Sequence, residues 1–172
     1  MKKAFSVFAV IIILFAAGCK KQKNESLSPP SAPSSYSSDI KINYNELEMT
    51  AQLTQNSAED FSIQFITPSP LAPLLLSYKD GNCTVNYGEL TFETELDRFP
   101  QAEIGALIIH SISDAIQGID IKATRLDGIW TYKGTGERGS FSLTRDEETG
   151  AWLELDIEGA NLKVIFSNFE IK

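Results

Sequence analysis

Apolar and polar residues alternate along much of the chain after residue 60. Three segments show this pattern clearly, with an apolar residue at every second position: 61–65, 83–87 and 153–157. Because successive side chains of a strand point to opposite faces, this period predicts strands that place one face on a core. Turn-forming residues separate the strands at 80–82, 134–139, 148–150 and 158–161. The pattern indicates hairpins of an antiparallel meander.

One segment departs from this period. Between Pro100 and Gly118, apolar residues recur at helical spacing: Ile104, Leu107, Ile108, Ile112, Ala115 and Ile116. The spacing predicts an amphipathic helix over 101–117, with Gly118 as its C-terminal stop. We therefore expect an α+β fold, in which an antiparallel sheet packs against one main amphipathic helix.

The N-terminus has the pattern of an export signal. Lys2 and Lys3 precede an apolar run over residues 4–17, which only Ser6 interrupts. About 14 apolar residues fall short of the roughly 20 that a membrane-spanning helix needs. Residues 1–18 are therefore predicted to be a cleaved signal peptide.

The segment Leu-Phe-Ala-Ala-Gly-Cys at 14–19 resembles a lipobox, the processing site of bacterial lipoproteins. The resemblance implies that Cys19 receives a diacylglyceryl group and, after cleavage, becomes an N-terminus carrying acyl chains such as palmitate. Two acyl chains give stable anchoring. We expect the protein on the extracytoplasmic face of the cell membrane, or in the outer membrane of a Gram-negative host. An ordinary secretory signal with an incidental cysteine is the alternative.

A polar segment separates the cysteine from the predicted domain. Residues 19–38 are rich in Lys and then in Ser and Pro, with almost nothing apolar to bury. This segment is predicted to be a tether, and residues 39–172 are predicted to form a single folded domain, expected to be monomeric. The net charge of −8 argues against nucleic acid as a partner.

The order of elements resembles the LolA/LolB-like lipoprotein-carrier superfamily. The resemblance rests on a strand through Phe65, Pro68, the run 74–78, an Asp-Gly turn at 80–81, and a C-terminal pattern at 146–150, 152 and 164–169. It covers residues 60–172. It implies a curved antiparallel sheet, an incomplete barrel whose concave face is covered by helix and encloses an apolar cavity. In some members that cavity holds acyl chains.

Apolar positions on the helix are the candidate ligand-binding residues. They are Leu107, Ile108, Ile112 and Ile116. Leu71 joins them because it lies in the proline-rich segment 68–73, which is expected to be a lid, a rim or a plain strand connection.

Candidate chemistry elsewhere has an ordinary structural interpretation. His110, the only histidine, falls beside the apolar stripe and is expected to face water. Residues 134–139 match G-x-G-x-x-G, but a strand pattern follows where a phosphate-binding motif requires a helix. The acidic residues 146–148 lack the spacing of a calcium loop. We therefore expect no catalytic residue, metal site or cofactor, and no enzymatic activity.

The strand period assigns a face to two further side chains. Cys83 shares the inward face of its strand with Val85 and Tyr87 and is expected to be a buried, inert thiol. Trp152 shares a face with Glu154, opposite Leu153, so it is interpreted either as an exposed aromatic or as a cover over the sheet edge.

Two functions fit this pattern. The first is a membrane-anchored lipoprotein, held through lipid at Cys19, that binds a lipid or other hydrophobic ligand on a concave apolar face. The second is a non-enzymatic structural or interaction lipoprotein with a solid core and an acidic partner-binding surface. The sequence leaves both open, because a cavity and a core are lined by the same residue types.

Overall fold

The computed structural model describes residues 29–94, 100–118, 120–136 and 139–172. The predicted signal peptide, Cys19 and the first part of the predicted tether lie outside these residues, as do Glu137 and Arg138 of the glycine motif. Among the described residues, no helix combines the length and apolar character needed to span a bilayer.

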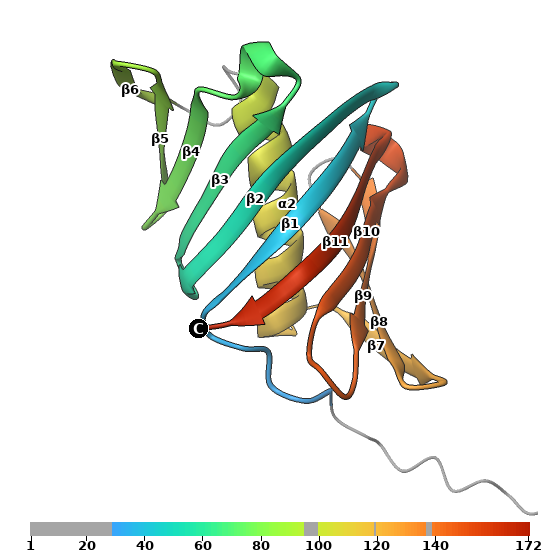
Figure 1. Cartoon of the computed structure of the whole chain (residues 1–172). Helices are drawn as coiled ribbons and strands as arrows, with labels where there is room; N and C mark the ends of the chain where they lie inside the picture. The colour runs from blue at the N-terminus through green and yellow to red at the C-terminus, as the bar shows by residue number, and fades with distance from the viewer. Residues whose placement is uncertain (1–28, 95–99, 119, 137–138) are drawn as a thin grey trace, which may run out of the picture.

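The described strands form one antiparallel sheet with the order β6-β5-β4-β3-β2-β1-β11-β10-β9-β8-β7. They are β1 (Tyr36–Tyr44), β2 (Leu47–Ser57), β3 (Asp60–Thr67), β4 (Leu74–Lys79), β5 (Asn82–Tyr87), β6 (Leu90–Thr94), β7 (Lys122–Leu126), β8 (Ile129–Gly136), β9 (Gly139–Asp146), β10 (Trp152–Ile157) and β11 (Leu162–Ile171). Chain neighbours pair, and the β1–β11 ladder joins the two halves. The sheet curves strongly, and its edges β6 and β7 do not pair with each other (Figure 1). The predicted curved, incomplete barrel is confirmed.

Among the described residues, one long helix lies against the concave face of this sheet (Figure 1). This helix, α2, spans Pro100–Gln117 and confirms the predicted helix. Its stop is also as predicted: Gly118 has φ +68° and donates its N–H to Asp114 O at 2.9 Å. Two short 3-10 helices, η1 (Ser69–Leu71) and η2 (Glu158–Ala160), connect strands.

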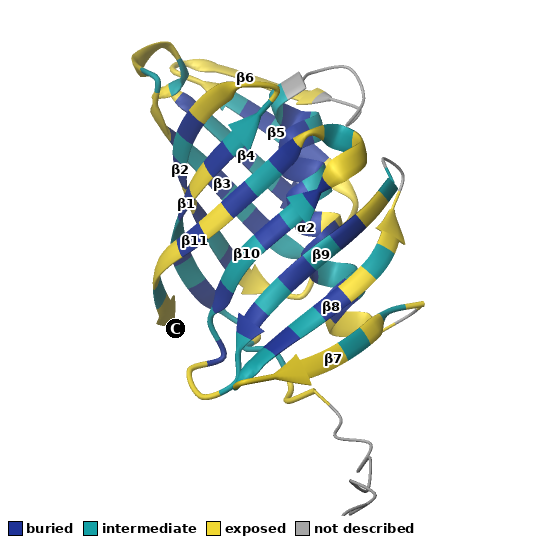
Figure 2. Ribbon diagram, turned by 90° about the vertical axis from the view of Figure 1, so that its right-hand side faces the viewer, coloured by how far each residue is buried: buried dark blue, intermediate teal, exposed yellow. Residues whose placement is uncertain are grey.

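The alternation predicted from the sequence fixes which side chains form the core. Figure 2 shows buried and exposed positions alternating along the strands. The core contains side chains with no solvent exposure from both halves of the sheet and from α2, here called the apolar middle: Ile42, Leu53, Ile63, Leu143, Leu155, Val164, Ile108 and Ile112. Burial at about 25 cal/mol per Å² of apolar surface makes this region the main source of stability.

Gly105 lets the helix approach the sheet closely. A Cβ at this position would overlap the Tyr78 hydroxyl and lie 2.9 Å from Tyr78 Cζ. Tyr78 uses this space to donate its hydroxyl to Ala102 O at 2.7 Å, inside the protein. Burial raises the pKa of Tyr78 far above its ordinary value, and neighbouring Cys83 adds to the rise. The first turns of α2 are thus fixed on β4.

Two predictions of side-chain placement are wrong. The strand period puts Trp152 on the outward face with Glu154, but Trp152 is only 1% exposed. A register irregularity between these residues, opposite β9, adds a residue to β10 and reverses the face of everything before it. The helical spacing puts Ile116 on the buried stripe, but Ile116 is 38% exposed, because it lies in the last turn beyond the cover of the sheet.

Other placements are confirmed. Cys83 is buried, at 1% exposure, and His110 is exposed, but Tyr87, predicted on the same inward face as Cys83, is 41% exposed. The glycine motif connects β8 to β9 rather than opening a helix.

The folded part starts before the predicted boundary at residue 39. Strand β1 begins at Tyr36, which is fully buried, and residues 29–35 lie across one end of the sheet (Figure 1). We call residues 29–35 the strap. Its Ser35 carbonyl accepts the Lys172 N–H at 3.1 Å, and its Ser35 hydroxyl donates to Gln55 O at 3.2 Å. Part of the polar segment is therefore docked on the domain.

Candidate functional site

The structure does not gather the predicted ligand-binding residues around one cavity. Ile108 and Ile112 belong to the apolar middle, while Ile116 is at the exposed end of α2. Leu71 is partly buried in η1, and Leu107 packs, also partly buried, on the opposite side of the helix from β3 and β4.

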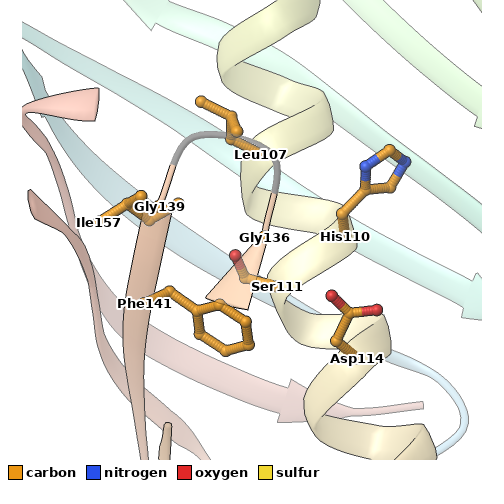
Figure 3. Close-up of a pocket in the computed structure, with 8 residues that line it drawn as sticks. All are labelled: Leu107, His110, Ser111, Asp114, Gly136, Gly139, Phe141 and Ile157. Carbon is orange, nitrogen blue, oxygen red and sulfur yellow. The ribbon is translucent and has the colours of Figure 1, made fainter. Parts of the chain in front are cut away.

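Leu107 lines a small pocket between α2 and the β8–β9 hairpin (Figure 3). The pocket offers about 30 Å³, room for about two water molecules. His110, Ser111 and Asp114 lie around it, but His110 points away from Ser111, so these side chains do not form a nucleophile and base pair. The space behind the helix is therefore filled rather than open to a ligand.

A larger cleft lies along the other margin of α2. This helix-margin cleft has a volume of about 410 Å³, within the range of small-molecule sites. Its floor is apolar and its rim is polar. The floor is formed by Phe61, Tyr78 and Ile109, and the rim by Ala58, Glu59, Lys79, Asp80, Gly81, His110, Ser113 and Gln117.

Tight turns and a row of helix residues shape the cleft. Asp80 and Gly81 form the β4–β5 turn with φ of +50° and +80°, a conformation that glycine adopts without strain. On the facing wall, Ile109, Ser113 and Gln117 follow one another four residues apart and so lie along one face of α2. The arrangement can bury an apolar body and hydrogen-bond its polar end.

A second group of unusual side chains lies at the end of the sheet that the strap covers. We call this group the aromatic end; it consists of Tyr36, Gln55, Trp130, Arg145 and Trp152. All are at most 4% exposed. Trp130, Arg145 and Trp152 are direct neighbours across β8, β9 and β10, and the Arg145 guanidinium lies 5.4 Å from the Trp152 ring centroid.

Arg145 is held by carbonyl oxygens. It donates from Nε to Gly150 O at 2.9 Å, and from its two terminal nitrogens to Pro30 O at 2.8 Å and Ser31 O at 2.9 Å. Within the part of the chain that the structure describes, no carboxylate pairs with it, whereas Arg125 pairs with Glu147. A buried guanidinium thus relies on the strap for two of its hydrogen bonds.

Several other polar atoms of the aromatic end have no hydrogen-bond partner among the described residues. They are Tyr36 Oη, Gln55 Oε1, Trp130 Nε1 and Trp152 Nε1. Burial raises the pKa of Tyr36 well above its ordinary value, and the Trp152 indole opposes part of the rise. The indole and the hydroxyl are therefore near each other, although no hydrogen bond of good geometry joins them. Buried unpartnered groups cost about 1–3 kcal/mol each.

Metal chemistry has no evident site in the described part of the chain, where no group of three or more His, Cys, Asp or Glu side chains is placed to hold an ion.

Comparison with known proteins informs the fold. No family model and no curated protein matches the sequence. A solved structure of an uncharacterised conserved protein from Thermus thermophilus shares 12% identity over 81% of this chain and 80% of that one, with a TM-score of 0.53.

Two further similar structures have lower scores. A LolA superfamily protein from Nitrosomonas europaea has a TM-score of 0.40, with 9% identity over 83% of this chain and 87% of its own. A DUF1329 family protein from Desulfovibrio piger has a TM-score of 0.43, with 10% identity over 81% of this chain and 86% of its own. Of these three, the Thermus protein exceeds 0.5, and at 12% identity it shares the fold alone.

Proposed function

We propose that this chain is a lipid-anchored, extracytoplasmic, non-enzymatic binding protein that takes up a hydrophobic ligand in the helix-margin cleft. The observation that carries the proposal is the cleft itself, with its apolar floor, its polar rim and its volume of about 410 Å³. The apolar middle is filled, so the ligand lies along the helix rather than inside the sheet.

The cleft suits an elongated apolar molecule with a polar end. Phe61, Tyr78 and Ile109, each at most 7% exposed, lie at the base of the cleft. Burying each methylene against such a surface contributes about 0.8 kcal/mol. Lys79 and His110 at the rim supply hydrogen bonds to the polar end, which stays near solvent.

The anchor would place this cleft near a membrane. If lipid is attached at Cys19, about ten residues of the predicted tether separate it from the docked strap. At roughly 5–6 Å times the square root of length, its average reach is about 17 Å. The domain would thus stand near the bilayer surface, where apolar ligands are concentrated.

Native mass spectrometry of protein purified from membranes tests ligand binding. We expect a bound hydrophobic molecule on the unmodified chain and on Ile116→Trp, whose side chain lies outside the cleft. Ser113→Trp, which adds the same side chain inside the cleft, should lose it. Equal ligand content in the two variants would contradict the proposal.

Membrane fractionation tests the anchor separately. Cys19→Ala removes the thiol to which the diacylglyceryl group would be attached, so the leader should stay uncut or be cut elsewhere, and protein cut elsewhere should leave the membrane fraction. Cys83→Ala serves as the control, since that thiol is buried in the domain. Membrane retention and processing that are unchanged in Cys19→Ala would exclude lipid anchoring.

The filled core is also consistent with the second function, a structural or interaction lipoprotein with an acidic partner-binding surface and no ligand. This alternative rests on the pocket of only about 30 Å³ behind the helix. It predicts that the purified chain carries no small molecule and that filling the cleft with Ser113→Trp has no effect on ligand content.

A further inference from the structure

Arg145 is the starting point for a second binding site, remote from the helix-margin cleft. Its charge is buried, at 4% exposure, and its partners are three carbonyl oxygens. A guanidinium pairs more strongly with an ionised oxygen than with a carbonyl, because such hydrogen bonds are charge-assisted and two can form in parallel. Arg145 would therefore form stronger hydrogen bonds with an ionised oxygen than it forms with the carbonyls of Pro30 and Ser31.

The neighbours of Arg145 also present unused donors. Trp130 and Trp152 flank it on the adjacent strands, and the indole N–H of each is buried without a partner among the described residues. The Tyr36 hydroxyl, near Trp152, is likewise buried without a described partner. One cation and three unpartnered donors, against one unpartnered acceptor at Gln55 Oε1, make an environment that favours an anion.

The strap is the cover of this group. The strap is held on the domain by the hydrogen bonds that two of its carbonyls accept from Arg145, by the hydrogen bonds of Ser35 and by the packing of Ala32 on the core. Ala32 and Pro33 are half-buried, whereas the side chains of Pro29, Pro30 and Ser31 are exposed. A segment held in this way can leave at modest cost. Its departure would uncover aromatic surface beside the guanidinium.

We propose that the aromatic end is a binding site for an oxyanion carried on an apolar body, a carboxylate or phosphate amphiphile, and that the strap occupies this site until such a ligand displaces it. The oxyanion would take the two terminal nitrogens of Arg145 from Pro30 and Ser31 and accept hydrogen bonds from the unpartnered donors. The apolar body would cover the surface that Ala32 leaves. This proposal is independent of the helix-margin cleft.

Both tryptophans of the chain belong to the aromatic end, so the intrinsic fluorescence of the purified protein reports on this site. The probes are decanoate, decanol as the uncharged analogue, decyl phosphate, and inorganic phosphate as the free anion. In Ala32→Gln the larger polar side chain should expel the strap while leaving Arg145 intact. Ser31→Gln adds the same side chain at an exposed neighbouring position and is the matched control.

We expect Ala32→Gln to bind decanoate or decyl phosphate at least tenfold more tightly than the unmodified chain and Ser31→Gln. Whichever amphiphile binds more tightly identifies the head group. Decanol and inorganic phosphate should leave the fluorescence unchanged. Equal affinities of Ala32→Gln and Ser31→Gln for both amphiphiles would overturn the proposal. So would decanol binding as tightly as decanoate, or inorganic phosphate binding as tightly as decyl phosphate.

Two further measurements test the roles of Arg145 and the strap. Arg145→Gln should abolish the response to the amphiphiles; because this change also removes strap contacts, circular dichroism must show that the variant is folded. Hydrogen exchange of the unmodified chain supplies a test without substitution: decanoate should raise deuterium uptake at Lys172, whose N–H donates to the Ser35 carbonyl of the strap. Uptake that stays constant at saturating decanoate and decyl phosphate would show that the strap is not displaced.

Discussion

The apolar middle and the aromatic end are built from the same sheet but have opposite characters. The middle consists of aliphatic side chains with no solvent exposure and no polar atoms to satisfy. The aromatic end is buried almost as well, yet it contains a guanidinium without a described carboxylate and several polar atoms without described partners. The apolar middle is optimised for stability. The aromatic end retains the free-energy cost of buried polar atoms without partners, which a region with a purely structural role is expected to lose.

The largest expected effect is in the apolar middle. Ile112→Asp buries an unpaired carboxylate at a position with no exposure and should cost several kcal/mol, enough to unfold a domain whose stability is about 5–15 kcal/mol. Ile116→Asp, one turn later and 38% exposed, should cost less than about 1 kcal/mol. Thermal unfolding followed by circular dichroism compares the two variants. Similar losses would mean that the core does not end where the structure places it.

Gly105→Ala should be the next most damaging change. The new methyl group would displace Tyr78 and weaken its hydrogen bond to Ala102, at a cost of about 1–3 kcal/mol. Gly136→Ala is the control, because its Cβ would meet no atom within 4 Å. Chemical denaturation measures both free energies of unfolding. A neutral Gly105→Ala would contradict the close packing of α2 on β4.

Removal of one hydroxyl at the contact between α2 and β4, and of one at the aromatic end, sharpens the comparison. Tyr78→Phe breaks a buried hydrogen bond and leaves Ala102 O without that partner, so it should cost about 1–2 kcal/mol. Tyr36→Phe removes a hydroxyl without a described partner and should be neutral or slightly stabilising. Equal losses of stability in urea denaturation would show that Tyr36 is as well satisfied as Tyr78.

The same two tyrosines should make stability fall at alkaline pH. Burial raises both pKa values above the ordinary value near 10, so the unfolded chain loses these protons first as the pH rises. The stability that the two tyrosines contribute is fully present below about pH 9. Above pH 10 the free energy of unfolding decreases by at most about 1.4 kcal/mol per pH unit for each group. Each Tyr→Phe variant should show a shallower slope. Slopes identical to that of the unmodified chain would exclude this origin.

Much of the fold is predictable because burial imposes a regular period. The strands at 61–65, 83–87 and 153–157, the helix over 101–117, its glycine stop and the buried Cys83 follow from alternation or helical spacing, whereas β1 and β2 are not predicted. The face of Trp152 does not follow, because one extra residue in β10 reverses the two faces and nothing in the local sequence marks that irregularity. The exposure of Ile116 cannot be predicted either, because helical periodicity does not show at which residue the sheet stops covering the helix.

The sites are harder to predict because they depend on distant contacts. The helix-margin cleft lies between α2 and the β2–β3 and β4–β5 turns, which are distant from the helix in the sequence. A local signal for it is the row Ile109, Ser113 and Gln117, which lies beside the apolar stripe of the helix. The aromatic end offers a clearer signal: Arg145 follows Phe141 and Leu143 at the same period and so occupies an inward position. A charged residue at such a position indicates a buried interaction. Its strap partners lie in the segment predicted to be free tether.

The central claim is that the apolar middle serves stability while ligand is held at the margin of α2. The most direct measurement is the affinity of 1-aminoanthracene, an uncharged aromatic fluorophore, for Ile112→Ala and Ser113→Trp, with thermal unfolding of the same samples. We predict that Ile112→Ala loses about 2–5 kcal/mol of stability but keeps its affinity below its unfolding temperature. Ser113→Trp should keep its stability and lose at least tenfold in affinity. Weakened binding in Ile112→Ala together with unchanged binding in Ser113→Trp would contradict the account and place the ligand beneath the helix.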